Sequence, residues 1–503
     1  MNQASQALGE LTTEQLQSIL RGIEKESLRS TPQGGLAMTP HPATLGSPLT
    51  HPHITTDFSE SQIELITGVH RNVLSCLDEL TQLQQVTTRA LVDEMLWASS
   101  MPCGLPEDHL IPIGQYGTSN VGRSKSVYRM GLGHRYGRRM QTISGIHYNW
   151  SLPGVSSEAY FGLIRNFRRN AFLLLYLFGA SPAVCTTFVA GRDHRLQTLN
   201  EYTRYLPYAT SLRMGRLGYQ SDAQTSLAIS YNSLPDYLNA LQNAMRQPYP
   251  PYETIGVRSP DGAYRQLSTS LLQIENEFYG TIRPKRVLRP GERPVHALRE
   301  RGVEYVEVRL MDLDPFETVG IGAQTMRFLD VFLVHCLVSN SPPDTSDEIA
   351  ALGRNQHKVA ERGREPGLVL ERSGESVVLT TWAAELLQSM RPIAQRLDTI
   401  EGNLAHQVAL DAAVDSLAHP DTLPSARVLQ AVKAQPNGSF VAFVRSRSKE
   451  IKEAMQSMPM PHALEEHYKA MAHASVLEQK STEREDTLDF DDYLQNYLSA
   501  ASA

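Results

Sequence analysis

Carboxylate side chains recur in stretches of the chain where polar and apolar residues alternate. Glu24 and Glu26 are two residues apart in one such stretch, and His147 lies on the polar side of a second. Glu307 and Arg309 share the polar side of a third. Residues two apart share a face of a β-strand. If these stretches pair in one sheet, its polar face carries a cluster of carboxylates with a histidine and an arginine.

A face of this composition indicates chemistry on phosphate groups. Close carboxylates repel each other, and one of a pair takes up a proton unless a cation binds between them. Mg²⁺ is bound by carboxylate oxygens and commonly bridges them to phosphate oxygens. An arginine nearby suits the charge on a transferring phosphoryl group. The alternative is an ordinary half-exposed sheet with a mixed polar face, which is the commoner case for any one strand.

The elements that would position these side chains follow from periodicity and from helix-breaking residues. Strands are expected at residues 22–29, 61–67, 144–152, 268–279 and 303–310. In the fourth of these, one face would carry Gln273, Glu275, Glu277 and Tyr279. Helices are expected at residues 12–21, 71–98, 125–140, 157–178 and 326–337, with several more between residues 380 and 457. Strands interspersed with helices at irregular spacing favour an α+β fold.

Three further segments are predicted to lie outside regular structure. Residues 31–53 contain many Pro and Gly residues and form a loop. Residues 114–122 are glycine-rich but lack the Gly-Lys-Ser/Thr ending of a P-loop, so a structural loop is favoured over a phosphate-binding one. Residues 483–493 are acidic and are predicted to be mobile at the surface.

The four cysteines are Cys76, Cys103, Cys185 and Cys336, and no CxxC spacing occurs. This scatter argues against a zinc ribbon and against a disulfide framework, so free thiols in a reducing cytoplasm are expected. Cys185 has no activating neighbour in the sequence and is predicted to be a buried structural thiol.

The overall composition excludes several classes of function. The 503 residues include 47 Lys+Arg and 54 Asp+Glu, for a net charge of −7, which gives no electrostatic footprint for nucleic acid or an anionic membrane. No apolar run approaches the about 20 residues that a membrane span needs. The start of the chain has no signal-peptide pattern, and a cytoplasmic location is expected. One catalytic domain is expected over residues 1–503, with the motif-bearing part at 21–340 and a mostly helical part at 341–503.

Several long blocks resemble the proteobacterial-type (type 1) glutamate–cysteine ligase family, also called γ-glutamylcysteine synthetase. One block is Gln-Tyr-Gly-Thr-Ser-Asn at residues 115–120, and together the blocks are highly specific. The other blocks, in family order, are 21–29, 54–60 continuing to Glu64, 140–149, 178–182, 206–213, 273–279 with 282–286, and 304–309. Two positions depart from the family: the link at 154–158 is short, and Leu310 stands where a serine is more usual. Neither departure falls on a position expected to carry chemistry.

The resemblance implies both a fold and a reaction. The fold would be related to that of glutamine synthetase, with a curved, largely antiparallel sheet forming a funnel, helices outside it, and the active site on the inner polar face. The reaction would join L-glutamate to L-cysteine at the expense of ATP, through γ-glutamyl phosphate, as the first step of glutathione biosynthesis.

The resemblance also implies roles for individual residues. The positions that match the family's metal ligands are Glu24, Glu26, Asp57, Glu64, His147 and Glu307. They would hold Mg²⁺ around the ATP phosphates, and the histidine would also suit Mn²⁺ as a substitute. Arg309 matches the catalytic arginine that stabilises the transferring phosphoryl group. The positions that match the substrate pockets are Arg213 and Gln141 for glutamate, Tyr219 and Tyr279 for the cysteine carboxylate, and Phe58, Tyr128 and Leu132 for the thiol side chain.

Other functions remain open on the sequence alone. A ligase of the same fold could use a different amine acceptor, and a metal-dependent phosphohydrolase could consume ATP without glutamate. A binding protein without activity is a third alternative, which the complete set of ligand residues and Arg309 argue against. No residue is identified as the base for the cysteine amine or as a contact of the adenine, and feedback inhibition by glutathione remains open.

Overall fold

The computed structural model describes residues 8–218, 223, 227, 229–289 and 291–500. Its centre is a sheet of seven strands in which every pair is antiparallel. The strand order is β2 (Ile54–Thr56), β3 (Gln62–Ile66), β1 (Leu20–Ser30), β5 (Ile146–Ser151), β10 (Tyr305–Met311) and β9 (Ile282–Lys285), and β4 (Met95–Leu96) pairs with the end of β1. The structure therefore confirms the expected α+β class.

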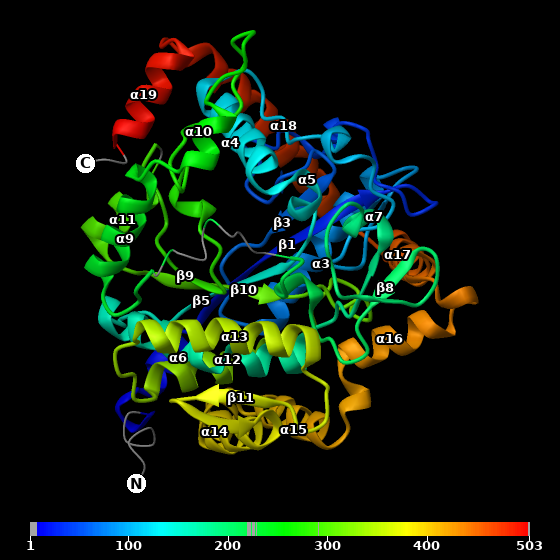
Figure 1. Ribbon diagram of the computed structural model, residues 1–503, viewed down its shortest axis with the longest axis vertical. Coiled ribbons are helices and arrows are strands. Elements are labelled where there is room, and N and C mark those ends of the chain that lie inside the picture. Colours follow the sequence, from blue (N-terminus) through cyan, green and yellow to red (C-terminus); the bar gives the residue numbers. More distant parts are fainter. Residues whose placement is uncertain (1–7, 219–222, 224–226, 228, 290, 501–503) are drawn as a thin grey trace.

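Helices cover the apolar face of this sheet. α3 (Val73–Ala90) packs against β1 and β3, and α6 (Ser157–Phe178) packs against β9 and β10. α12 (Ala323–Val338) lies against both helices and is almost entirely buried. In Figure 1, α13 (Ser346–Arg362) runs beside α6, and the C-terminal helices α14 (Leu379–Glu401) and α15 (Ala405–Ala418) form a further layer below α12.

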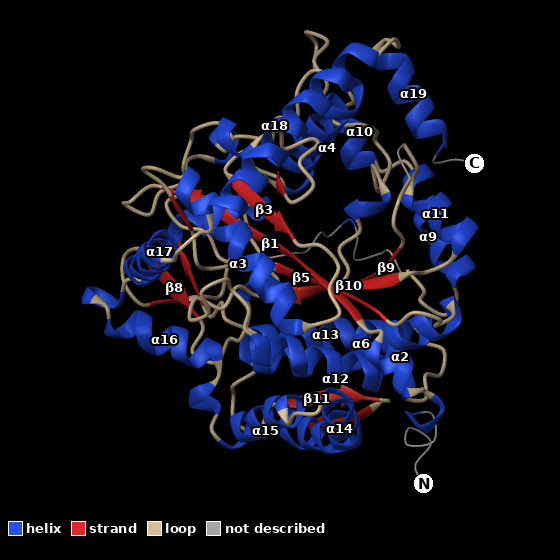
Figure 2. Ribbon diagram, turned by 180° about the vertical axis from the view of Figure 1, so that it is seen from behind, coloured by secondary structure: helices blue, strands red, loops and turns tan. Residues whose placement is uncertain are grey.

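A second group of helices lies on the opposite, polar side of the sheet. Figures 1 and 2 show α4, α10 and α19 gathered above the strands, and α18 extends from the side of α3 to the loop before α4. Their bounds are α4 (Asn120–Tyr136), α10 (Pro250–Ile255), α18 (His462–Glu485) and α19 (Phe490–Ala500), and α5 (Arg138–Gln141) follows α4. The polar face of the sheet is thus roofed by chain segments from the middle and the end of the sequence.

The other elements connect or brace these layers. The helices are α2 (Thr13–Gln17), α7 (Thr186–Val189), α9 (Leu234–Arg246), α11 (Pro294–Arg301), α16 (Pro424–Ala434) and α17 (Phe440–Ser457). The strands are β6 (Ala183–Cys185), β7 (Gln197–Thr198), β8 (Thr203–Tyr205), β11 (Val369–Arg372) and β12 (Glu375–Val378). Two 3-10 turns near the site are η3 (Leu212–Met214) and η4 (Glu275–Glu277). Within the described residues, no helix is both long enough and apolar enough to cross a membrane.

Four of the five expected strands are confirmed as β1, β3, β5 and β10, and the helix expected at 157–178 is confirmed as α6. The prediction of a fifth strand at residues 268–279 is wrong, because this segment consists of turns and η4. Its glutamates do not share a sheet face: Glu275 pairs with Arg293 at 2.6 Å, and Glu277 pairs with Arg135 at 2.9 Å. The strand in this region is β9, a few residues later.

Three helices are shorter than, or offset from, the sequence expectation. The helix at 12–21 ends at Gln17, because β1 already begins at Leu20. The helix at 71–98 starts after its cap Asn72 and ends at Ala90, and β4 follows it. The helix at 125–140 begins earlier, after the cap Ser119, and breaks at Gly137, whose φ of 81° suits a glycine.

Most residues of the acidic tail are exposed, as predicted, but the segment is anchored to the rest of the molecule. Residues 483–485 end α18, residues 490–493 begin α19, and a short link joins the two helices. Phe490 and Leu494 are buried against Leu267, and Asp491 pairs with Arg258. Apolar residues that recur at helical spacing fix α19 to the molecule, although the acidic residues between them dominate the sequence pattern.

The prediction of four free thiols is also wrong. Cys103 and Cys185 form a disulfide across 82 residues of sequence, with Cα atoms 5.3 Å apart. Cys76 and Cys336 are free and buried, as expected. Sequence spacing could not indicate the pair, because the two cysteines meet only when β6 packs near the loop after β4.

Candidate active site

The polar face of the sheet brings the predicted acidic residues together. Glu24 on β1 lies opposite His147 on β5, and Glu26 lies opposite Glu64 on β3. His147 Nδ1 is 3.1 Å from Glu24 Oε2 and 3.8 Å from Glu307 Oε1, and its Nε2 is 3.6 Å from Glu26 Oε1. One imidazole is therefore surrounded by three carboxylates, two from β1 and one from β10.

Several atoms of this cluster have the arrangement of metal ligands. Ligand atoms of Glu24, Glu64 and His147 all lie within 4.8 Å of one another. His147 Nε2, Glu307 Oε2 and Asn149 Oδ1 are buried and have no hydrogen-bond partner within the described residues. Buried polar atoms are normally satisfied, and orphaned ones call for an ion or a ligand. Oxygen atoms with one imidazole nitrogen suit Mg²⁺ or Mn²⁺.

Two carboxyl groups of the cluster have raised pKa values. Burial, together with the nearby charge of Asp57, raises the pKa of Glu26 to about 8. Burial and the charges of Glu24, Asp57 and Glu26 raise the pKa of Glu64 well above its ordinary value. These shifts are the signature of carboxylates brought together without a cation between them.

Other carboxylates in the cleft remain ionised. The pKa of Glu307 falls well below its ordinary value, because Arg309, Lys285, His147 and Arg283 outweigh its burial. Arg309 Nη1 lies 3.0 Å and Lys285 Nζ 3.2 Å from Glu307 Oε1. Burial and Glu307 oppose ionisation of Glu24, but its hydrogen bond and charge interaction with His147 lower its pKa overall. Cations and anions thus alternate along the floor of the cleft.

All six residues predicted as metal ligands surround one cleft of about 380 Å³. Five of them line its surface: Glu24, Asp57, Glu64, His147 and Glu307. Glu26 lies just beneath His147. Asp57 follows β2, and its backbone oxygen accepts hydrogen bonds from Tyr116 and Arg129, which anchor the turn that carries it.

The residues predicted for the thiol pocket lie together at one wall of this cleft. Phe58 and Leu132 are buried and form a small apolar cluster, against which Tyr128 packs. Four residues that line the cleft come from one side of α4, since positions 125, 128, 129 and 132 follow helical spacing. Gln141 Nε2 donates to Tyr279 Oη at 2.7 Å, so these two predicted substrate residues are in direct contact.

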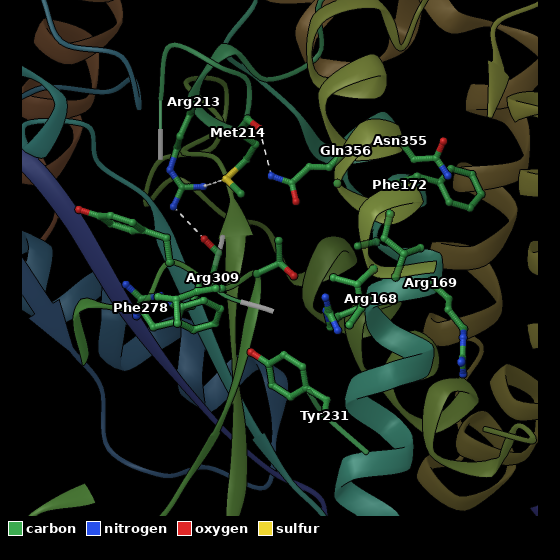
Figure 3. Close-up of a pocket in the computed structure, with 18 residues that line it drawn as sticks. Arg168, Arg169, Phe172, Arg213, Met214, Tyr231, Phe278, Arg309, Asn355 and Gln356 are labelled. Carbon is green, nitrogen blue, oxygen red and sulfur yellow. Dashed lines mark hydrogen bonds between the residues drawn. The ribbon is translucent and has the colours of Figure 1, made fainter. Parts of the chain in front are cut away.

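Arg213 lines a neighbouring cavity of about 260 Å³, which shares Arg309 and Tyr279 with the first. Figure 3 shows Arg213 next to Met214 and Arg309, with Arg168 and Arg169 of α6 on the far side. Arg213 Nη2 donates to the backbone oxygen of Arg309 at 2.8 Å. Tyr219, the remaining predicted substrate residue, lies outside the described residues.

The cleft contains residues that the sequence analysis did not assign. Arg283 and Lys285 project from β9, and Lys125 and Arg129 from α4. The two-residue spacing in β9 would have identified the first pair, had the strand been placed at 282–285 instead of 268–279. Tyr497 of α19 also lines the cleft, and the sequence offered no signal for it because its neighbours are remote in the chain.

The glycine-rich loop is structural, as predicted. Thr118 N donates to Glu483 at 2.9 Å, and Asn120 N donates to Asp486. A Cβ added to Gly117, whose φ is +80°, would lie 2.2 Å from both Gln479 and Glu483. The backbone amides of Thr118 and Asn120 therefore bind carboxylates of the C-terminal segment.

Comparisons of sequence and of structure with known proteins all find glutamate–cysteine ligases. A sequence model of the family described as glutamate-cysteine ligase matches residues 6–359. The chain is 45% identical to the glutamate–cysteine ligase of Alcanivorax borkumensis over 505 residues, covering 96% of each chain. It is 46% identical to that of Azotobacter vinelandii, covering 96% of this chain and 95% of the relative. The crystal structure of the Francisella tularensis enzyme in complex with AMP superposes with a TM-score of 0.91 at 37% identity, covering 96% and 98% of the two chains.

Proposed function

Because the chain belongs to the glutamate–cysteine ligase family, we propose that it joins the γ-carboxylate of L-glutamate to the amine of L-cysteine, using ATP. The observation that carries the proposal is the cleft itself. It combines a carboxylate–histidine cluster suited to cations, arginines for phosphate oxygens, and an adjoining apolar wall. Use of ATP agrees with the AMP bound to the Francisella relative.

The donor set of the cleft fits Mg²⁺, with Mn²⁺ as a substitute. We propose that the ions are held by Glu24, Glu26, Asp57, Glu64, His147 and Glu307. When bound, the ions would neutralise phosphate oxygens and align the reacting groups. The orphaned atoms of His147 and Glu307, and the raised pKa values of Glu26 and Glu64, support this assignment.

The cationic side chains would then act on the phosphate chain. Arg309 lies at the junction of the two cavities and can stabilise the charge on the phosphoryl group as it moves from ATP to the glutamate γ-carboxylate. Lys285 and Arg283 lie beside Glu307 on the edge strand, where they can hold the remaining phosphates. The γ-glutamyl phosphate that forms is a good acyl donor, and the cysteine amine displaces its phosphate.

The apolar wall supports cysteine as the acceptor. Phe58, Leu132 and Tyr128 form a small surface that suits an uncharged thiol side chain. We propose that Gln141 and Arg213 contact glutamate, and that Tyr279 and Tyr219 contact the cysteine carboxylate. The hydrogen bond between Gln141 and Tyr279 would place the two amino acids next to each other.

We further propose that the whole chain acts as one catalytic unit. Tyr497, near the C-terminus, lines the same cleft as Glu24, near the N-terminus. We place the reaction in the cytoplasm, where ATP is available, although the Cys103–Cys185 disulfide is unusual for that compartment.

The test is ATP-dependent phosphate release in the presence of Mg²⁺, with glutamate and cysteine each omitted in turn. The proposal predicts release only when both amino acids are present, with γ-glutamylcysteine identified by mass. Equal release without glutamate would identify a phosphohydrolase instead. Release with another amine in place of cysteine, and not with cysteine, would identify a ligase with a different acceptor. Glutathione added to the same assay measures feedback inhibition.

A further inference from the structure

Asp312 is a fully buried carboxylate that the proposed reaction does not use. It follows β10 directly, three residues after Arg309, and its side chain has no solvent exposure. Burial raises its pKa, while Arg213 and hydrogen bonds from Ser181, Ala180 and Ser211 oppose the rise. A buried charge of this kind is destabilising unless it is paired and hydrogen-bonded, so its partners indicate what it does.

The partners of Asp312 come from two loops that meet beside the second cavity. Ala180 N donates to Oδ2 at 2.8 Å and Ser181 Oγ at 2.5 Å, while Ser211 Oγ donates to Oδ1 at 3.0 Å. The loops are also joined to each other, because Leu212 N donates to the backbone oxygen of Ser181 at 2.8 Å. Asp312 therefore ties the end of the catalytic strand to the turn η3.

Arg213 is the residue that this turn presents. Its Nη1 lies 3.8 Å from Asp312 Oδ1, and its Nη2 reaches the backbone oxygen of Arg309. On its other side the guanidinium lies against Gly145, where an added Cβ would be 2.1 Å from Nη2. The side chain is only 1% exposed. The guanidinium is therefore held between a carboxylate, a strand carbonyl and a glycine that leaves room for it.

The charges that line this cavity are all positive within the described residues. Four arginines line the cavity, namely Arg168, Arg169, Arg213 and Arg309, and no described acidic residue does. The partners of the other three are Asp344, Glu348 and Glu307. Asp312 is a carboxylate paired with Arg213. Removing its charge would take away a fully buried anion that faces this guanidinium.

We propose that Asp312 is a positioning residue that holds Arg213 in the orientation needed to bind the glutamate substrate. The inference rests on the proposed function, since Arg213 is there assigned to the glutamate pocket. Asp312 itself lies behind Arg213 and lines neither of the two cavities.

The first variant is Asp312→Asn, which keeps the shape and removes the charge. The expected result is a 10- to 100-fold rise in the KM for glutamate, the range that displacement of a binding group produces. The kcat and the KM for ATP are expected to stay unchanged. The matched control is Asp330→Asn, because Asp330 is equally buried and pairs with Arg21 at 3.0 Å on the apolar side of the sheet. This control is expected to lower Tm without raising the KM for glutamate.

Arg213→Gln separates failure of this inference from failure of the site assignment. If Arg213→Gln leaves the KM for glutamate unchanged, Arg213 does not bind glutamate. The assignment of Arg213 to the glutamate pocket and the positioning role of Asp312 are then both wrong. If Arg213→Gln raises that KM but Asp312→Asn does not, only the positioning role is wrong. The double variant Arg213→Gln/Asp312→Asn is expected to match Arg213→Gln alone, since Asp312 acts through Arg213. Additive effects would overturn the inference.

A milder variant covers the case in which Asp312→Asn does not fold. Ser211→Ala removes one hydrogen bond to Asp312 and keeps both charges. It is expected to raise the KM for glutamate about two- to fivefold, consistent with loss of one hydrogen bond. An unchanged KM for glutamate in a folded Ser211→Ala protein would contradict the positioning role.

Discussion

Replacement of Glu64 by glutamine should separate the stability of the metal-free protein from its response to Mg²⁺. Glu64 lies beside Glu24 and His147, with ligand atoms within 4.8 Å of one another. Burial and the neighbouring carboxylates raise its pKa well above its ordinary value, which favours the neutral acid in the metal-free protein. Glutamine has the shape of that acid, and we expect metal-free Glu64→Gln to be at least as stable as the wild type.

The response to Mg²⁺ should differ. An ion at 100 times its Kd stabilises the folded state by about 2.7 kcal/mol. Disturbing one group of a metal site weakens binding by about 10- to 100-fold. At the same Mg²⁺ concentration, the variant would then gain only about 0.4–1.4 kcal/mol. The increase in Tm caused by Mg²⁺ should therefore fall to about half or less of the wild-type value.

Thermal unfolding with EDTA and with Mg²⁺ measures both quantities. The control is Glu275→Gln, since Glu275 is a buried glutamate that pairs with Arg293 outside the carboxylate cluster. This control should lower the metal-free Tm and keep the full Mg²⁺ increment. A full increment in Glu64→Gln, or no increment in the wild type, would refute the assignment of the cluster as a metal site.

Four further outcomes follow from the structure. Arg309→Lys should lower kcat about 10²- to 10³-fold with an unchanged Mg²⁺ increment in Tm; a near-normal kcat would exclude Arg309 from phosphoryl transfer. Leu132→Ala should raise the KM for cysteine about 10-fold or more and leave the KM for ATP unchanged; equal rises in both would indicate general damage. Tyr497→Ala should raise the KM of a substrate, whereas Tyr493→Ala on the same helix should mainly lower Tm, because, of these two residues, it is Tyr497 that lines the cleft. The same changes in KM and Tm for both variants would show that α19 has only a structural role. In EDTA, Tm should fall as pH rises from about 5 to 8, because burial and Asp57 raise the pKa of Glu26 to about 8 and the stabilising proton is lost in that window. Glu26→Gln should make Tm less dependent on pH. A Tm that rises with pH would contradict this prediction.

The sequence predicted the floor of the site well because alternation within a strand is a local property. Glu24 and Glu26, and likewise Glu307 and Arg309, each lie on one strand, so a spacing of two residues placed each pair on one face. The sequence could not predict that His147 lies opposite Glu24, because the pairing and register of these strands depend on contacts across more than 100 residues.

The errors arose where the partners of a residue are distant in the sequence. The glutamates at 275 and 277 have the spacing of a strand, but they turn inward because Arg293 and Arg135 reach them from other elements. The disulfide between Cys103 and Cys185 was missed for the same reason. The tail at residues 483–493 was predicted to be mobile because of its acidic residues, whereas its buried apolar residues determine where it packs.

The contribution of α19 to the roof of the cleft could not be predicted. This helix packs beside α4, as Figure 1 shows, although more than 350 residues separate the two helices. The second cavity likewise depends on how α6, α13 and η3 meet. Such sites depend on tertiary packing, which local periodicity in the sequence does not reveal.

The fate of the glutamate oxygen tests the central claim most directly. The enzyme would be supplied with ATP, Mg²⁺, cysteine and glutamate labelled with ¹⁸O in the γ-carboxylate, and the released phosphate analysed by mass. Formation of γ-glutamyl phosphate predicts that each phosphate carries one ¹⁸O from glutamate. Phosphate without ¹⁸O would mean that water attacked ATP, and the ligase account would be wrong.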